Sequence, residues 1–441
     1  MAQRTKTDGT PEFTLSVEWP SARVSGAEPV LDASLGRIGI TVRDTPVTAY
    51  KRDRGDTGTT LTIPLYDVAE WIALNWWPLL FEPQKGDQSE DDPDFRDRHW
   101  LGTARHGFAL PDLWFLPAGN KLELSAESVY LRFARLTFTE PVNESVPLLA
   151  ARTALAQFVD DVVGHITDRG IRETQLHYAW NLVRETPPDE EQYCRLIGAL
   201  GLSPYEEHDE IDNLLDKLSD SLDERILADL FQASDVRGLA RTSDLAERIS
   251  VALSTANEVD IRPLADIDFP DDHAAQAWRW GVEATRNVRT HFGISNFDPT
   301  GGATFFEQLG LDPTAGTHVA ADETIVGQVS AAIERRDASL RVVLAGAQER
   351  QRRFAAARAA FLGWSTESGA SRLVTRARTR EQQASRAFAA EMLAPIAYIR
   401  RNAGGGTISA WRIEELADDL GVAAQVVQYQ AQNNGINVWA P

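Results

Sequence analysis

Residues 353–362 read Arg-Phe-Ala-Ala-Ala-Arg-Ala-Ala-Phe-Leu, and residues 381–395 read Glu-Gln-Gln-Ala-Ser-Arg-Ala-Phe-Ala-Ala-Glu-Met-Leu-Ala-Pro. Alanine is the strongest helix former, so both stretches favour helix. The first stretch is apolar on nearly every side, which is typical of a helix enclosed by protein. The two stretches therefore predict two buried helices.

The order of the two stretches resembles the ImmA/IrrE family of bacterial metallopeptidases. Members typically read RFTLAHELGH and then, twenty or more residues later, ExEANxFAAELLMP; residues 353–354 and 388–395 keep this frame. The flanking segments that also match are 274–292, 305–311 and 413–435. The resemblance covers about residues 270–440 and implies a zincin-like fold there. An alanine-rich buried helix pair of any other origin is the alternative.

The residues that would carry zinc chemistry are missing. Zinc hydrolysis needs two histidines one turn apart on one helix face, a glutamate base beside the first, and a third ligand. The matching positions hold Arg358 and Leu362 for the histidines, Ala359 for the glutamate and Gln383 for the third ligand. No histidine occurs after His318. The resemblance therefore implies ancestry and fold, while these residues argue against peptidase activity, a bound metal and any cofactor.

Arg358 is predicted to need hydrogen-bond acceptors, because an unpaired buried charge is strongly unfavourable. In the fold that the resemblance implies, the second helix faces the first and supplies them. The expected acceptors are Gln383, Glu381 and Glu391.

The vacated groove is predicted to bind a partner. Arginine forks suit carboxylates and phosphates, and arginine is enriched at binding hot spots. The candidate groove residues are Arg353, Arg358, Arg372, Arg376, Arg378, Arg380, Gln383, Arg386 and Glu391. The alternatives are a solvated charged loop, or docking of these arginines onto the chain's own acidic helices at 206–224.

Composition predicts a cytoplasmic protein without membrane contact. The chain has 441 residues, one cysteine and a net charge of −21, which suits two or three domains without a disulfide framework. The N-terminus has no apolar stretch, and no run approaches the length of a membrane span. Residues 331–401 differ from the rest, with 14 arginines, no lysine and six acids. This segment can bind an anion, an acidic partner, or the acidic half of its own chain.

Local patterns predict an α+β fold in three parts. These are a β-rich N-terminal domain over 1–145 with a Trp-rich helix at 67–81, an acidic helical domain over 146–262, and the degenerate peptidase-like domain over 263–441. Strand-like alternation occurs at Thr14–Trp19, Ile38–Val42, Thr60–Leu65, Leu122–Ser125 and Tyr130–Thr139. Helical patterns occur at Val146–Thr167, Gln175–Glu185, Glu190–Leu200, Asp209–Leu222, Arg225–Gln232 and Asp244–Thr255.

His99, His106 and Asp112 form the most enzyme-like group of the first part. The two histidines are seven residues apart and could line one site with a nearby aspartate. Their spacing fits no standard metal pattern, and no serine or cysteine stands beside them as a nucleophile. The alternative is a pair of loop histidines that pack on neighbouring tryptophans.

Two segments, 193–222 and 413–435, have the outline of a helix-turn-helix. The helix after Ser203 is rich in aspartate and glutamate, and the last helix of the tail carries glutamine and asparagine without a cation. A reader helix needs cations or amides that reach phosphates and base edges. Sequence-specific binding to duplex DNA is therefore not expected.

Three functional hypotheses follow. The first is a non-catalytic pseudopeptidase that binds a protein or peptide, expected to be encoded nearby, as a regulatory or sensor component in a bacterial stress, toxin–antitoxin or phage-defence setting. The second is an enzyme with its activity in the N-terminal domain. The third is nucleic-acid or nucleotide binding by the Arg-rich C-terminal region. The oligomeric state is left open.

Overall fold

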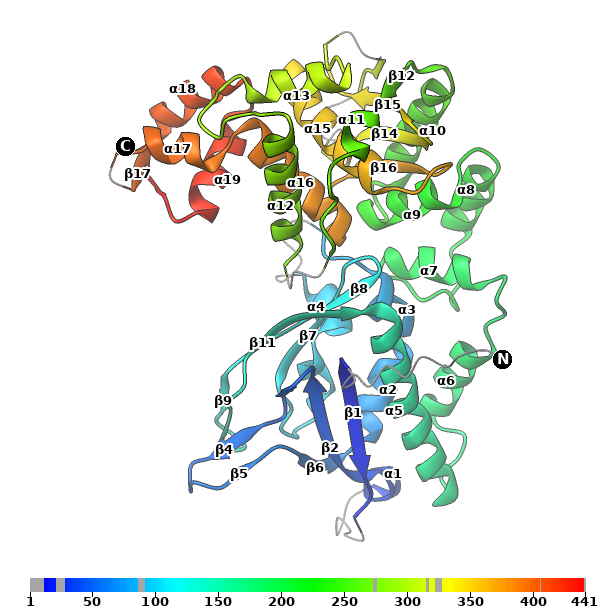
Figure 1. The fold of residues 1–441 in the computed structure, drawn as a ribbon. Helices are drawn as coiled ribbons and strands as arrows, with labels where there is room; N and C mark the ends of the chain where they lie inside the picture. Colours follow the sequence, from blue (N-terminus) through cyan, green and yellow to red (C-terminus); the bar gives the residue numbers. More distant parts are fainter. Residues whose placement is uncertain are drawn as a thin grey trace, which may run out of the picture. The chain divides into compact units, whose positions relative to one another are not determined.

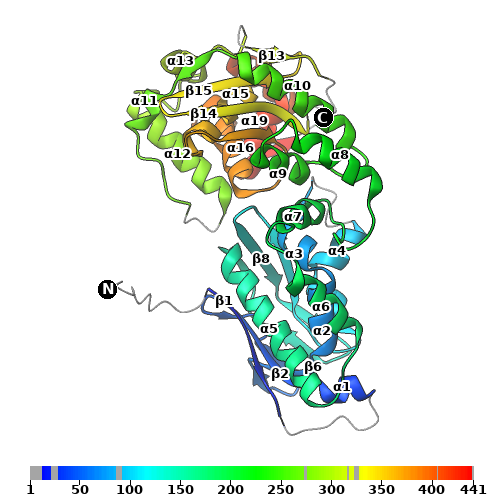
Figure 2. The same cartoon turned by 90° about the vertical axis from the view of Figure 1, so that its right-hand side faces the viewer.

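The computed structural model describes residues 12–20, 28–85, 92–272, 276–314, 317–321, 327–404 and 406–439. The chain divides into two compact units, unit 1 over residues 1–207 and unit 2 over residues 208–441. Helices and strands occur in both (Figures 1 and 2), which confirms the predicted α+β class. Among the described residues, no helix is long and apolar enough to cross a membrane.

The described residues of unit 1 form three small antiparallel sheets. The first joins β1 (Phe13–Glu18), β2 (Leu35–Val42), β3 (Thr45–Pro46) and β6 (Leu61–Pro64). The second runs in the order β5 (Thr57–Gly58), β4 (Tyr50–Arg52), β10 (Leu136–Phe138) and β9 (Val129–Leu131). The third runs in the order β11 (Val142–Pro147), β8 (Lys121–Glu127) and β7 (Asp112–Pro117). Along β7 and β8 every second residue is buried, as expected for a sheet with one face on the core.

The helices of unit 1 pack on these strands and on one another. They are α1 (Pro29–Ala33), α2 (Tyr66–Leu74), α3 (Trp76–Phe81), α4 (Pro93–His99), the 3-10 helix η1 (Leu101–Arg105), α5 (Leu148–Asp168), α6 (Gln175–Glu185) and α7 (Glu191–Ala199). α5 contacts β1, and α2 contacts both α5 and α6. The predicted Trp-rich helix is divided at Asn75 into α2 and α3, and Trp71, Trp76 and Trp77 are all in the core.

Unit 2 is built on a five-stranded sheet. Its order is β12 (Glu258–Asp260), β15 (Ser339–Ala345), β14 (Val329–Arg336) and β16 (Ser371–Thr375), with β13 (His318–Val319) also paired to β15. The helices are α8 (Asp209–Ser219), α9 (Glu224–Ala233), α10 (Leu239–Thr255), α11 (Arg262–Ala265), α12 (Ala277–His291), α13 (Gly301–Leu309), α15 (Glu349–Ser365), α16 (Arg380–Leu393), α17 (Ile396–Asn402), α18 (Ala410–Leu420) and α19 (Ala424–Asn433). β17 (Thr407–Ser409) and β18 (Asn437–Trp439) form a separate parallel pair.

Helices cover both faces of this sheet. Leu340 lies on the face that packs on α15, where its side chain fills the space beside Gly363. Val343 and Leu373 point to the opposite face, which α9 and α10 cover, and both side chains are fully buried. A strand that is buried on both faces has an unbroken apolar sequence, as 342–345 does.

α16 contacts α15 and also packs very closely on α12. Small residues make the second approach possible, because a Cβ at Gly281 would collide with the carbonyl oxygen of Ala384. The hydroxyl of Thr285 donates to the carbonyl of Phe388 at 3.2 Å across the same contact. The backbone of α16 is therefore held tightly, and the side chains on its other faces are positioned with it.

The boundary between the units falls inside the segment predicted as one acidic helical domain. α5, α6 and α7 belong to unit 1, whereas α8, α9 and α10 belong to unit 2. An amphipathic pattern shows that a helix buries one face, but it does not show against which element.

Candidate functional site

The candidate site lies where α15 and α16 meet in unit 2. Ala359 and Leu362, which the resemblance matches to the general base and the second histidine, are fully buried members of the apolar core. Neither side chain offers a donor atom to a metal ion. The polar side chain that α15 contributes to this contact is that of Arg358.

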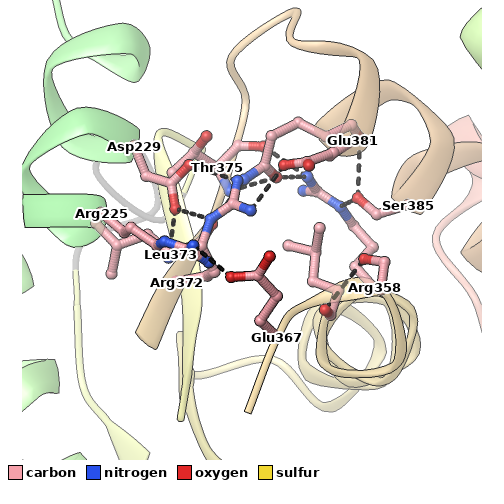
Figure 3. A network of polar contacts seen from close by, with 12 residues as sticks. Arg225, Asp229, Arg358, Glu367, Arg372, Leu373, Thr375, Glu381 and Ser385 are labelled. Carbon is pink, nitrogen blue, oxygen red and sulfur yellow. Dashed lines mark hydrogen bonds and ion pairs between the residues drawn. The ribbon is translucent and has the colours of Figure 1, made fainter. Parts of the chain in front are cut away.

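Arg358 is buried between the two helices, with only 6% of its surface exposed. Its Nε donates to the Ser385 hydroxyl at 3.1 Å (Figure 3). Its Nη2 donates to the side-chain oxygen of Gln382 at 2.8 Å and to the carbonyl of Thr375 at 2.5 Å. All three acceptors are neutral. A cation with fixed hydrogen bonds thus occupies the position that the predicted resemblance assigns to the first zinc ligand.

The predicted source of these acceptors is correct, but the predicted residues are wrong. α16 supplies two of them, as expected, through Gln382 and Ser385. Gln383 instead donates its amide to the carbonyl of Arg378 at 2.7 Å, in the loop before α16. Successive side chains along a helix point in directions that differ by about 100°. A shift of one position therefore decides which side chain faces α15.

This contact carries an excess of positive charge. Arg386 donates to the carbonyls of Thr375 at 3.3 Å and Ala377 at 3.1 Å. Burial lowers the pKa of Arg358 well below its usual value, and the nearby Arg386 lowers it further. Burial, followed by the charge of Arg378, lowers the pKa of Arg386 to about 10. The hydrogen-bond acceptors that the structure gives the two guanidinium groups include no carboxylate.

Arg372, unlike Arg358 and Arg386, is paired with carboxylates. Its Nε and Nη2 donate to the two carboxylate oxygens of Asp229 at 2.8 and 3.0 Å, and its Nη1 lies 2.7 Å from Glu381 (Figure 3). Asp229, on α9, is only 3% exposed and also accepts from the backbone N–H of Leu373 at 2.9 Å. Burial alone would lower the pKa of Arg372, but the two carboxylates outweigh it and raise that pKa.

Two more groove candidates pair with carboxylates of unit 2. Arg380, only 1% exposed, donates to both oxygens of Asp272, with its shortest contact at 2.5 Å. Arg376 lies 3.9 Å from Asp235 near the surface. Internal pairing, the alternative to a partner site, therefore accounts for Arg372, Arg376 and Arg380. The acceptors are not the acids at 206–224 that were expected, but carboxylates at 229, 235 and 272.

Glu391 connects α16 to the C-terminal helices. Its carboxylate accepts from the N–H of Ile396 at 3.2 Å and from the amide of Gln430, on α19, at 2.9 Å. Burial raises the pKa of Glu391. The side chain is thus committed to internal contacts.

Arg353 is the groove candidate that borders a cavity. The cavity has a volume of about 370 Å³ and lies between the end of α13 and the first turns of α15. Phe306 and Leu311 give it an apolar side, and Glu307 and Glu349 lie at it as well. Among the described residues, the Arg353 guanidinium has no hydrogen-bond or ion-pair partner, and its Nε is buried. It is therefore able to receive a carboxylate or phosphate from a ligand.

The three N-terminal candidates do not form one site. His99 is fully buried and shares a hydrogen bond with Glu82 at 3.0 Å. His106 is largely exposed and lies 3.2 Å from Asp67. Asp112 accepts from a tryptophan indole at 2.5 Å. Three separate pairs replace the single cluster. The alternative of loop histidines that pack on neighbouring tryptophans does not describe His99, which is the last residue of α4 and stacks on Phe95.

Glu82 is the residue of this region that the sequence did not single out. Its carboxylate accepts from the Arg98 guanidinium at 2.7 and 2.8 Å as well as binding His99. Burial would raise its pKa, but the hydrogen bonds from His99 and Arg98 outweigh this and lower the pKa to about 2. The only signal in the sequence is an acid directly after the apolar helix at 67–81.

Within the described ranges, no group of three or more His, Cys, Asp or Glu side chains is arranged to hold a metal ion. Comparisons with protein-family models, with curated proteins and with solved structures find no match for this chain. The resemblance to the ImmA/IrrE family therefore stays a prediction from the motifs at 353–362 and 381–395.

Proposed function

We propose that this protein is a non-catalytic relative of the ImmA/IrrE peptidases that regulates by binding a protein or peptide. The observation that carries the proposal is Arg358, a buried cation held by three neutral acceptors at the first-ligand position. Zinc prefers thiolate, imidazole and carboxylate donors, so this environment repels it. A zincin-like helix pair without its ligands keeps its fold, and a binding role is the simplest one left to it.

The cavity beside Arg353 is the proposed partner site. It combines one unpaired guanidinium with the apolar side chains of Phe306 and Leu311. This chemistry suits an acidic or C-terminal carboxylate next to an apolar side chain of a peptide. The resemblance places such a protein in bacterial stress, toxin–antitoxin or phage-defence regulation, where partners are commonly encoded by adjacent genes.

The test of the partner site is co-expression with the products of the neighbouring genes, followed by calorimetry on any complex. Arg353→Ala is expected to weaken binding about tenfold or more, because it removes a charge-assisted hydrogen bond. Arg350→Ala is the matched control, since Arg350 lies one turn away and pairs with Asp418 near the surface. Equal affinities for wild type and Arg353→Ala would contradict the site.

Metal analysis tests the lack of catalysis separately. Purified protein should contain no stoichiometric zinc and should not cleave a co-purified partner. Zinc that is bound by the wild type and lost in Gln383→Ala would refute the non-catalytic assignment.

A further inference from the structure

Two hairpins of unit 1 form a small sheet that carries unpaired cations. One hairpin contains β4 and β5, and the other contains β9 and β10. β4 pairs with β10, so the four strands form one continuous sheet. The N–H of Asp53 donates to the carbonyl of Arg135 at 3.2 Å, which joins the two turns.

Strand register defines an outward face on this sheet. Lys51 is opposite Thr137, and Thr137 is opposite Tyr130, so these three side chains share one face. The next row contains Leu136 and Leu131, which are buried and mark the inward face. Two strand spacings separate Lys51 from Tyr130, which is about 10 Å.

This sheet carries exposed positive charge, whereas the chain as a whole is negatively charged. The double-hairpin surface, as we name it, is the outward face of these strands with their turns. The two hairpins carry five exposed cations, Lys51, Arg52, Arg54, Arg132 and Arg135, of which Arg52 lies in the row of Leu136 and not in the outward row. Among the described residues none of the five has an ion-pair partner, although the chain has a net charge of −21. The two carboxylates within the hairpins belong to Asp53 and Asp56, and that of Asp53 accepts from the Tyr130 hydroxyl at 3.1 Å.

Two aromatic rings lie among these cations. Tyr130 is 51% exposed, and Phe133, in the turn between β9 and β10, is 61% exposed. Large exposed aromatic side chains next to arginine are the combination that binds unpaired bases, because the rings stack on bases while the guanidinium groups hold phosphates. Two aromatic rings are too small an apolar area for stable attachment to a bilayer.

We propose that the double-hairpin surface binds single-stranded nucleic acid. Lys51, Arg54 and Arg132 contact phosphates, and Tyr130 and Phe133 each stack on a base. The four-stranded width of about 15 Å fits two or three nucleotides. A duplex would hide its bases from both rings. This inference concerns unit 1 and does not rest on the partner site of unit 2.

The acidic remainder of the chain limits the affinity. A net negative charge repels a polyanion at long range, and only contacts within a Debye length offset this. We expect a Kd between about 1 and 100 μM at low salt, in the range of non-specific binding. With these three phosphate contacts, the slope of log K against log salt should be about −2 for a single strand.

The experiment is fluorescence anisotropy of the full chain with labelled single strands of about 12 nucleotides in roughly 50 mM salt. Oligo-dT and oligo-U are tested in parallel, because they separate DNA from RNA as the source of the ligand. Arg54→Ala with Arg132→Ala, and separately Phe133→Ser, should each weaken binding at least about fivefold, since each removes phosphate or stacking contacts. Circular dichroism confirms that the variants fold.

The matched control is Arg169→Ala with Arg172→Ala. Both arginines are exposed in unit 1, and the change removes the same charge away from the hairpins. The control should bind within about twofold of wild type, because it alters only the distant field. An equal loss in the control, no effect of Phe133→Ser, or no binding of either oligonucleotide would overturn the proposal. Binding to phosphatidylglycerol vesicles without binding to the oligonucleotides would overturn it in favour of a membrane surface.

Discussion

Neutralising Glu82 should destabilise unit 1 by an amount that depends on pH. The buried carboxylate binds Arg98 through two hydrogen bonds and His99 through a third. In Glu82→Gln the side chain keeps its shape and one acceptor, but the Arg98 cation loses its counter-charge. The variant therefore isolates the ionic part of the contact.

The magnitude follows from the pKa of Glu82, which falls from 4.5 to about 2 in the folded protein. A depressed carboxyl pKa contributes stability above the unfolded value, and this contribution is lost as the pH falls through the folded value. At about 1.4 kcal/mol per pKa unit, Glu82 contributes roughly 3 kcal/mol at pH 7. By the same relation, about 2 kcal/mol of this contribution to stability remains at pH near 3.5.

The assay is hydrogen exchange of the full chain, read from peptides that cover α4 and β7, at several pH values between about 7 and 3.5. Glu18→Gln is the control, because Glu18 forms an exposed pair with Arg37 at 3.0 Å. Such a surface pair is worth less than about 1 kcal/mol. A Glu82→Gln deficit that stays constant over the whole pH range would refute the argument, because it would reflect lost packing and not lost charge.

Four further changes test the packing of unit 2 by urea unfolding. Asp229→Asn should cost about 3 kcal/mol, because it leaves a buried arginine without its bidentate partner. Arg358→Met should change the free energy of unfolding by less than about 1 kcal/mol, because the acceptors of Arg358 are neutral and an apolar side chain often replaces such a buried charge without loss. A loss as large as that expected for Asp229→Asn would contradict this. Glu391→Gln should match wild type at a pH below the unfolded value of 4.5 and should be more stable than wild type at neutral pH, because burial raises the pKa of Glu391 and wild type loses stability as the pH rises from the unfolded towards the folded value. Gly281→Ala should destabilise by about 2 kcal/mol through collision with α16, whereas Gly164→Ala, with open space around its Cβ, should be neutral or stabilising.

The sequence predicts most elements of this fold because their patterns are local. α6 has the predicted bounds, and α5, α7, α8 and α9 begin and end within a few residues of them. The predicted strand Tyr130–Thr139 is wrong, because the chain turns at 132–135 between β9 and β10. That turn contains no glycine, proline or asparagine, and Arg135 adopts a left-handed φ of 50° without the usual sequence signal.

The site was predicted less well, because it depends on contacts between distant segments. Burial of Arg358 was predicted from the alanine-rich pattern, its bonding to the second helix was predicted from the resemblance, and both are present. The choice of Gln382 over Gln383 depends on the rotation of α16, which close packing on α12 fixes. The bond between Arg372 and Asp229 spans 143 residues, so no local pattern could reveal it.

The number of arginines in a segment does not show how many of them are free to bind a partner, because some are paired within the folded chain. The segment 331–401, with 14 arginines, was the natural place to expect an anion-binding surface. Arg372 and Arg380 are buried against carboxylates, and Arg358 is buried against neutral acceptors, so these cations already have their partners inside unit 2. A cation contributes to recognition only if its charge is not already satisfied within the protein. By that criterion the guanidinium of Arg353 is the better candidate for a partner in unit 2. By the same criterion, the exposed cations of the β4–β5 and β9–β10 hairpins are the better candidates for a polyanion, although they lie in a part of the sequence whose overall composition gave no reason to look there.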